Sequence, residues 1–192
     1  MANEEEFERL VEAARNVSAI LRDAGIPHAL AGGLAAWARG GPKTEHDADF
    51  MVEPEDADAA LEALARAGLR TERPPEGWLY KAFDGDILVD LIFNPSSGLV
   101  TDELLERAEV LEVQAMPMRV ARLEDVMVTK LMALTEQEPD FGGVLEIARS
   151  LREQIDWNEV RARTTDSPFA AAFFTLLVEL QIVVTASEAG RP

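Results

Sequence analysis

Hydrophobic residues recur at helical spacing near the start of the chain and then give way to short, strand-like runs. The period predicts a helix over residues 4–24, which Gly25 ends. An apolar run at 27–31 predicts a strand, followed by a short helix from Gly32 to Trp37. Residues 47–52 predict a second strand. Residues 54–67 predict another helix, because Pro54 stands near its start and Gly68 just past its end.

The second half of the pattern completes a sheet and then becomes helical. Apolar runs at 78–83 and 86–93 flank Asp84-Gly85, a pair typical of a tight hairpin turn. A helix near 102–108 and strands at 110–113 and 117–120 are expected next. Further helices are predicted over 123–137, 141–153, 157–163 and 168–184. The whole pattern predicts an α/β (α+β) fold, with a mixed-sheet core over 1–120 and a C-terminal helical region over 121–192.

Composition and charge limit the cellular location and the binding partners that we expect. The 192 residues carry a formal net charge of −18, which repels nucleic acid unless a local basic patch exists. The absence of cysteine excludes disulfides and thiolate metal sites. The acidic N-terminus differs from a basic signal-peptide start, and no apolar run is long enough to cross a bilayer. We therefore expect a cytoplasmic protein that does not associate with membranes.

Basic residues gather late in the sequence. We expect them to form a solvated face with ion pairs, although one continuous patch for nucleic acid is the alternative. They are Arg119, Arg122, Lys130, Arg149, Arg152, Arg161 and Arg163.

Asp47 and Asp49 are two residues apart on a predicted strand. Side chains at this spacing point to one face, so the two carboxylates should converge while Ala48 and Phe50 face the core. One or two carboxylates together with substrate phosphate oxygens are the ligands that Mg²⁺ prefers. The pair predicts a divalent-metal site, for Mg²⁺ or Mn²⁺, against the alternative of an acidic strand edge.

Asp90 lies in the otherwise apolar run 87–93. An unpaired carboxylate buried there is costly, so it must meet a metal, a cation or hydrogen-bond donors. We expect a third metal ligand or a general base for an attacking hydroxyl, and the alternative is a buried ion pair with an arginine.

Gly32 and Gly33 follow a predicted strand and open a helix. Without side chains, their backbone N–H groups can approach a phosphate, and a helix N-terminus favours negative charge. An ordinary tight turn is the alternative for this pair.

Three further residues are candidates for nucleotide binding. Lys43 precedes Asp47 by four positions and can neutralise phosphate charge, unless it is simply exposed. Lys130 falls on the apolar stripe of its predicted helix, so it needs an anionic partner or must extend to solvent. Asp140, which precedes Phe141-Gly142-Gly143, fits a helix cap most simply.

The segments 28–35 and 43–50 together resemble the nucleotidyltransferase superfamily with the DNA polymerase β-like fold. Its pattern is an apolar strand, Gly-Gly or Gly-Ser, a helix, Asp-x-Asp and a third Asp on a later strand. Residues 123–131 are similar to the AbiEii/MenT-type toxin branch. That resemblance implies that a C-terminal lysine, here Lys130, and a following aspartate help to bind nucleotide. Asp140 is the candidate for this aspartate, and Glu146 is the alternative.

The resemblance implies an enzyme that moves NMP from an NTP to an acceptor hydroxyl. Residues 1–120 would form the catalytic core, and the metal ligands would be Asp47, Asp49 and Asp90. The toxin branch implies tRNA or a protein as acceptor and an antitoxin as partner. Glu45-His46 is similar to aminoglycoside and lincosamide nucleotidyltransferases, so a small-molecule acceptor is the alternative. A further alternative is a binding module that has the same fold but no catalytic activity.

Overall fold

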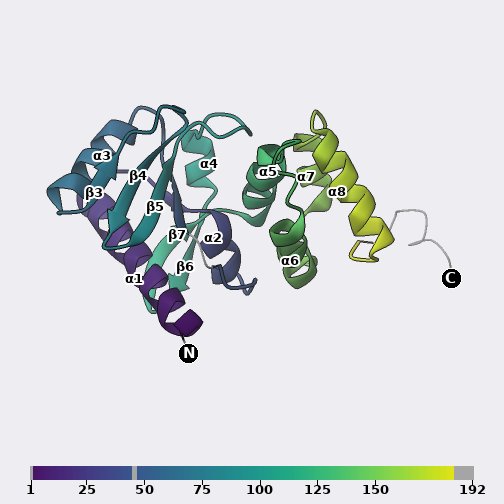
Figure 1. Cartoon of the computed structure of the whole chain (residues 1–192), viewed down its shortest axis with the longest axis horizontal. Coiled ribbons are helices and arrows are strands. Elements are labelled where there is room, and N and C mark those ends of the chain that lie inside the picture. The colour runs from purple at the N-terminus through teal and green to yellow at the C-terminus, as the bar shows by residue number, and fades with distance from the viewer. Residues whose placement is uncertain (1, 45–46, 184–192) are drawn as a thin grey trace.

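A single mixed sheet of seven strands forms the centre of the protein (Figure 1). The computed structural model describes residues 2–44 and 47–183. The strand order is β3-β4-β5-β2-β1-β7-β6, and the predicted α/β fold is confirmed. The strands are β1 (Ala29–Leu30), β2 (Asp47–Met51), β3 (Arg70–Glu72), β4 (Leu79–Asp84), β5 (Ile87–Ile92), β6 (Glu109–Val113) and β7 (Met116–Val120).

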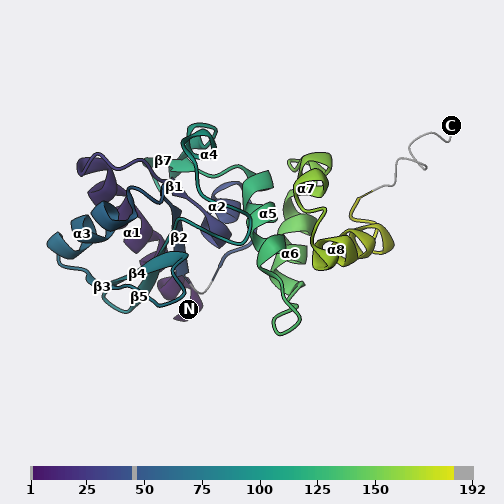
Figure 2. The same cartoon turned by 90° about the horizontal axis from the view of Figure 1, so that it is seen from above.

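The helices fall into two groups along the chain. Four lie among the strands in sequence, and the last four lie together beside the α/β part, next to α2 (Figures 1 and 2). The first group is α1 (Ala2–Asp23), α2 (Gly32–Ala38), α3 (Ala57–Arg66) and α4 (Asp102–Glu106). The second is α5 (Leu123–Ala133), α6 (Gly142–Leu151), α7 (Trp157–Arg163) and α8 (Pro168–Glu179).

The two faces of the central strands differ in chemistry. Helix α1 packs against β2 and β5, and α3 packs against β4 and β5. Ala48 and Phe50 of β2 are fully buried in the core that includes these helices. Because side chains alternate along a strand, Asp47 and Asp49 lie on the opposite face. The alternation expected from the sequence is confirmed, and it leaves the carboxylates free to form a site.

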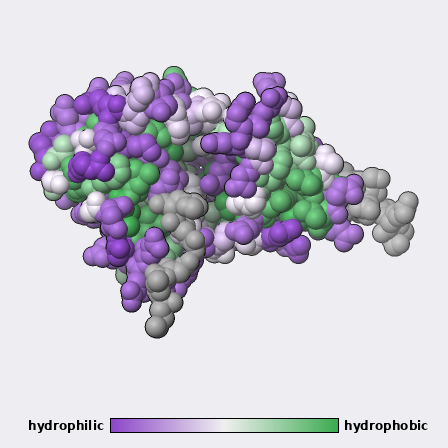
Figure 3. All heavy atoms as spheres, in the orientation of Figure 1, coloured by the Kyte–Doolittle hydropathy of each residue, from purple (hydrophilic) through white to green (hydrophobic). Residues whose placement is uncertain are grey.

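Two hydrophobic clusters hold the chain together. One joins α1, α3 and the sheet; the other joins α5–α8 and includes Ala36 of α2. Figure 3 shows hydrophilic side chains over most of the α/β part and hydrophobic ones exposed over the last helices. A domain boundary at residue 120 stays a prediction.

The hairpin turn lies one residue later than predicted. Gly85 and Asp86, not Asp84 and Gly85, connect β4 to β5, and Gly85 has φ +64°. Glycine tolerates this left-handed conformation at the first turn position. Asp84 instead extends β4 and pairs with Ile87. The shift changes which residue faces Asp90 across the hairpin.

Several predicted boundaries were also too wide. Helix α3 begins at Ala57, because residues 54–56 form a turn instead of its first turn. Helix α5 ends at Ala133, because Leu134 is extended and a turn closed by Thr135 and Glu138 follows. Helix α8 ends at Glu179. Strand β3 was not predicted, since its three residues are polar and line the sheet edge.

Among the described residues, no helix is both long enough and apolar enough to cross a membrane.

Candidate functional site

Three carboxylates converge at the centre of the sheet. Strands β2 and β5 are parallel neighbours, and their register places Asp49 directly beside Asp90. One oxygen from each of Asp47, Asp49 and Asp90 lies within 4.8 Å of the others. The structure therefore brings together the three carboxylates that the sequence predicted as metal ligands.

Asp90 is the most buried of the three, with 7% of its surface exposed. Its partner is the ammonium of Lys81, at 3.5 Å from Oδ1, rather than the arginine considered from the sequence. At this distance the contact is an ion pair, and the buried Oδ1 has no hydrogen-bond partner among the described residues. A buried acceptor in this condition can take a cation or a hydroxyl donor.

Sequence reasoning missed Lys81. The two-residue turn at 85–86 sets the register that pairs Lys81 with Asp90, whereas a turn at 84–85 places Leu79 opposite the carboxylate. A turn predicted at Gly85-Asp86, with glycine in the first position, would have placed Lys81 opposite Asp90.

The electrostatics of the site disfavour three bare negative charges. The pKa of Asp49 is raised to about 7, first by burial and then by the charges of Asp47 and Asp90, while Lys130 and Lys81 oppose the rise. Burial likewise raises the pKa of Asp90, with Lys81 opposing. Carboxylates that repel one another and lack solvent are stabilised by a bound cation.

Gly32 and Gly33 make room for the site. Gly32 has φ +57°, and a Cβ at this position would lie 1.7 Å from Oδ2 of Asp49. A Cβ on Gly33 would lie 2.7 Å from the side chain of Thr44. Helix α2, which these glycines open, has Ala31 at its N-cap, and among the described residues no side chain accepts from its first N–H groups.

Gly32→Ala is expected to disrupt the carboxylate cluster. The methyl group must displace Asp49 in addition to straining the backbone. Gly25→Ala is the matched control, since Gly25 has φ +73° but open space around its Cβ position. Both variants should lose about 1 kcal/mol of unfolding free energy from the backbone. Only Gly32→Ala should also lose transfer activity, and equal activity in the two variants would contradict this role of Gly32.

The remaining nucleotide-binding candidates line one pocket of about 450 Å³ beside α2. Lys130 comes from α5, Asp140 and Glu146 from the start of α6 and its approach, and Lys43 from the loop before β2. The α/β part and the helical part thus each contribute to the pocket. Its lining also includes Gly33, which connects it to the carboxylate cluster.

The pocket residues have different partners. Asp140 accepts a hydrogen bond at 2.8 Å from the N–H of Gly142, the first residue of α6, while Phe141 holds the N-cap position itself. Lys43 pairs with Glu4 at 2.6 Å and lies over the Phe7 ring. Lys130 is half-buried, and its charge opposes the rise in the pKa of Asp49. Glu45 and His46, which bore on the choice of acceptor, lie outside the described residues.

Several solved structures share this fold. ANT(2'')-Ia, determined in complex with adenylyl-2''-tobramycin, has a TM-score of 0.61 at 16% identity over 88% of this chain and 98% of its own. A Thermotoga maritima protein assigned to the same activity has a TM-score of 0.53 at 17% identity, over 76% of this chain and 92% of its own. A nucleotidyltransferase-like antigen of Paracoccidioides brasiliensis has a TM-score of 0.52 at 12% identity, over 88% and 93%. At these identities the likeness shows the fold.

The family to which the chain belongs follows from its sequence rather than from these structures. No curated protein matches the chain. Residues 10–170 match the family described as "Nucleotidyl transferase of unknown function (DUF2204)", and this match spans most of the chain. The chain therefore belongs to this family and is a nucleotidyltransferase.

Proposed function

We propose that the protein transfers NMP from an NTP to an acceptor hydroxyl with the help of divalent metal ions. The observation that carries this proposal is the convergence of Asp47, Asp49 and Asp90 within 4.8 Å. A non-catalytic module of the same fold has no need for three carboxylates that repel one another in a partly buried place. The cytoplasmic location expected from composition stays a prediction.

The carboxylate cluster fits Mg²⁺ or Mn²⁺ in its chemistry. The donors are all oxygens, the buried Oδ1 of Asp90 accepts no hydrogen bond from the described residues, and the pKa of Asp49 is raised. Bound at these three residues, the metal would neutralise the charge that develops on the transferred phosphoryl group.

The protein's own groups would orient the two reactants. The acceptor oxygen forms a bond to the α-phosphorus, and the bond from that phosphorus to the bridging oxygen of pyrophosphate breaks. The carboxylate of Asp90, which pairs with Lys81, would accept the proton of the attacking hydroxyl. The uncapped N–H groups at the start of α2 would hold the triphosphate tail.

Lys130 would bind the nucleotide phosphates. It lines the pocket next to Gly33, and its charge acts on Asp49. Lys130→Gln should raise KM for the NTP about tenfold, because one charge-assisted contact is lost. Arg149→Gln, an exposed change on α6, should leave KM unchanged. Initial rates over a range of NTP concentrations would measure both, and an unchanged KM in Lys130→Gln would exclude this contact.

For the acceptor, we favour a small hydroxylated molecule that carries positive charge. Three of the six late arginines expected either to pair or to form one patch, Arg122, Arg152 and Arg163, pair with carboxylates. Arg122 contacts Glu124 and Glu159 at 3.1 and 3.3 Å, and Arg163 contacts Asp125 and Glu159 at 2.7 and 2.9 Å. With a net charge of −18, the protein attracts cations and repels phosphate backbones.

The second candidate is a toxin-type activity on tRNA or a protein, controlled by an antitoxin. Its support is the similarity of residues 123–131 to the AbiEii/MenT branch, and the pocket position of Lys130 is compatible with it. An acidic toxin of this kind would suit a basic protein partner.

Labelled acceptors separate the two candidates. Purified protein would be incubated with Mg²⁺, each α-labelled NTP in turn, and either total RNA or amine-bearing polyols such as aminoglycosides. Label on the polyol that is absent with Asp47→Ala supports the first candidate. Label on a tRNA-sized band that depends on Asp47 supports the second and excludes our choice of acceptor. If Asp47→Ala labels an acceptor as well as wild type does, the carboxylate cluster is not the catalytic site.

A further inference from the structure

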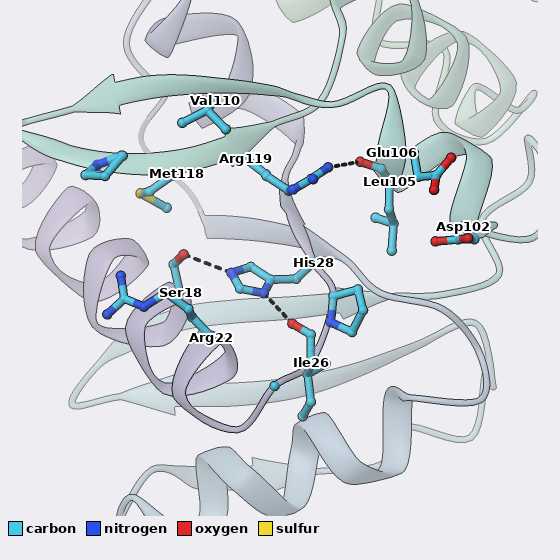
Figure 4. Close-up of a pocket in the computed structure, with 13 residues that line it drawn as sticks. Ser18, Arg22, Ile26, His28, Asp102, Leu105, Glu106, Val110, Met118 and Arg119 are labelled. Carbon is cyan, nitrogen blue, oxygen red and sulfur yellow. Dashed lines mark hydrogen bonds between the residues drawn. The ribbon is translucent and has the colours of Figure 1, made fainter.

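A second pocket, of about 520 Å³, lies at the opposite end of β1 from Gly32 and Gly33 (Figure 4). Helix α1, residues 25–28, helix α4 and the β6–β7 hairpin enclose it. Its volume lies in the range of small-molecule sites. None of the residues assigned to nucleotidyl transfer lines this pocket.

A fixed polar pair stands at the base of the pocket. His28 Nδ1 lies 2.8 Å from the carbonyl oxygen of Ile26, and Nε2 lies 2.9 Å from Oγ of Ser18. A carbonyl can only accept, so Nδ1 carries the proton and donates it. Burial, together with Arg22 and Arg119, lowers the pKa of His28, so the ring is neutral and Nε2 accepts from the serine hydroxyl.

Two guanidinium groups line the pocket, on opposite sides of His28 (Figure 4). Arg22 comes from α1 and pairs with Asp23 at 3.4 Å. Arg119 comes from β7 and donates to the carbonyl oxygen of Leu105 at 2.9 Å. Among the described residues, the Arg119 guanidinium has no carboxylate within ion-pair distance, so its remaining donors can bind an anion.

The rest of the lining is apolar, with acidic groups at the far side. Leu105 and Met118 are buried beneath the pocket, and Val110 at its rim is 64% exposed. Asp102 and Glu106 project from α4 on the side away from Arg22 (Figure 4). The groups of the lining that attract an anion are therefore the two arginines.

We propose that this pocket is a second, non-catalytic binding site for a small organic anion, with its carboxylate or phosphate held by Arg119, its apolar body on Leu105 and Met118, and Arg22 adding positive charge from the other side of His28. A guanidinium with free donors binds both kinds of oxyanion. Apolar walls with a few convergent polar groups are typical of small-molecule sites.

The imidazole signal of His28 in the NMR spectrum of the full-length protein tests the proposal. The probes are hexanoate, hexyl phosphate and uncharged hexanol, added at millimolar concentration in the presence of chelator and without NTP. We expect at least one of the two anions to shift the His28 signal in a saturable way. Hexanol should bind at least about tenfold more weakly, since it cannot engage the arginines. A response to only one of the anions would show which head group the site takes.

Arginine variants test whether the anion binds in this pocket. Arg119→Gln and Arg22→Gln should each weaken the binding about fivefold or more, and the unchanged remainder of the spectrum would show that both are folded. Arg66→Gln removes an exposed arginine paired with Glu62 and should have no effect. No shift of His28 with either anion, equal binding of hexanol, or unchanged affinity in both variants would overturn the proposal. Because the test uses neither NTP nor metal, its failure would leave the proposed function untouched.

Discussion

Replacing Asp49 with asparagine is expected to abolish nucleotidyl transfer while making the metal-free protein more stable. The folded protein holds a proton on Asp49, whose pKa is raised from 3.8 to about 7, while the unfolded chain loses it near 3.8. Because the folded state binds more protons, stability falls as the pH rises from about 4 to about 7. Asparagine removes this penalty, and it also removes a metal ligand.

The two effects of Asp49→Asn are measured separately. At pH 8 in chelator, denaturant unfolding should show a gain of about 4 kcal/mol, which should shrink to about 2 kcal/mol at pH 5. Transfer of label should fall at least about 1000-fold. Asp58→Asn is the control, since Arg73 lowers the pKa of this exposed carboxyl and removal of its charge should give no gain. A metal-free Asp49→Asn protein less stable than wild type at pH 8 would contradict the electrostatic account.

The second large effect is expected at Asp125, which ties the helical part to the α/β part. Its carboxylate is 1% exposed and accepts from Arg107, just after α4, at 2.6 and 3.1 Å. It also accepts from Arg163 of α7 at 2.7 Å. Asp125→Ala leaves two guanidiniums without their buried anion, so it should cost about 3–5 kcal/mol of unfolding free energy.

Equilibrium unfolding in urea checks the Asp125 prediction. The exposed pair of Asp58 and Arg73 has a similar contact distance, 2.8 Å, so Asp58→Ala is the matched control and should change the midpoint little. Because Asp125 and Lys130 share α5, the folded fraction of Asp125→Ala should also show a raised KM for NTP. Equal midpoints for the two variants would show that Asp125 is not a structural tie.

The carboxylate cluster could be predicted from the sequence because its causes are local. A spacing of two on a strand fixes the shared face of Asp47 and Asp49, and a charge in the apolar run 87–93 marks Asp90. Their closeness then follows from the parallel pairing of β2 and β5. The glycine pair was also found, although the structure adds that Gly32 makes room for the carboxylate of Asp49.

Other features depend on register and on contacts between distant segments. Lys81 pairs with Asp90 only because the turn is at 85–86, and a shift of one residue hides it. Strand β3 has no apolar alternation and exists through pairing with β4. The pocket at His28 joins α1, α4 and β7, which are far apart in the sequence, so no local pattern reveals it. Lys130 was marked by its place on the apolar stripe of its helix, whereas the nucleotide-binding role of Asp140 came from resemblance alone.

The most direct test of the central claim is the metal dependence of label transfer by wild type and Asp90→Asn. The account predicts that wild-type protein transfers the α-phosphoryl label only when Mg²⁺ or Mn²⁺ is present, that chelator stops the reaction, and that Asp90→Asn is inactive with either ion while remaining folded. Transfer that continues in chelator, or that proceeds at the wild-type rate without Asp90, would contradict the assignment of chemistry to this cluster.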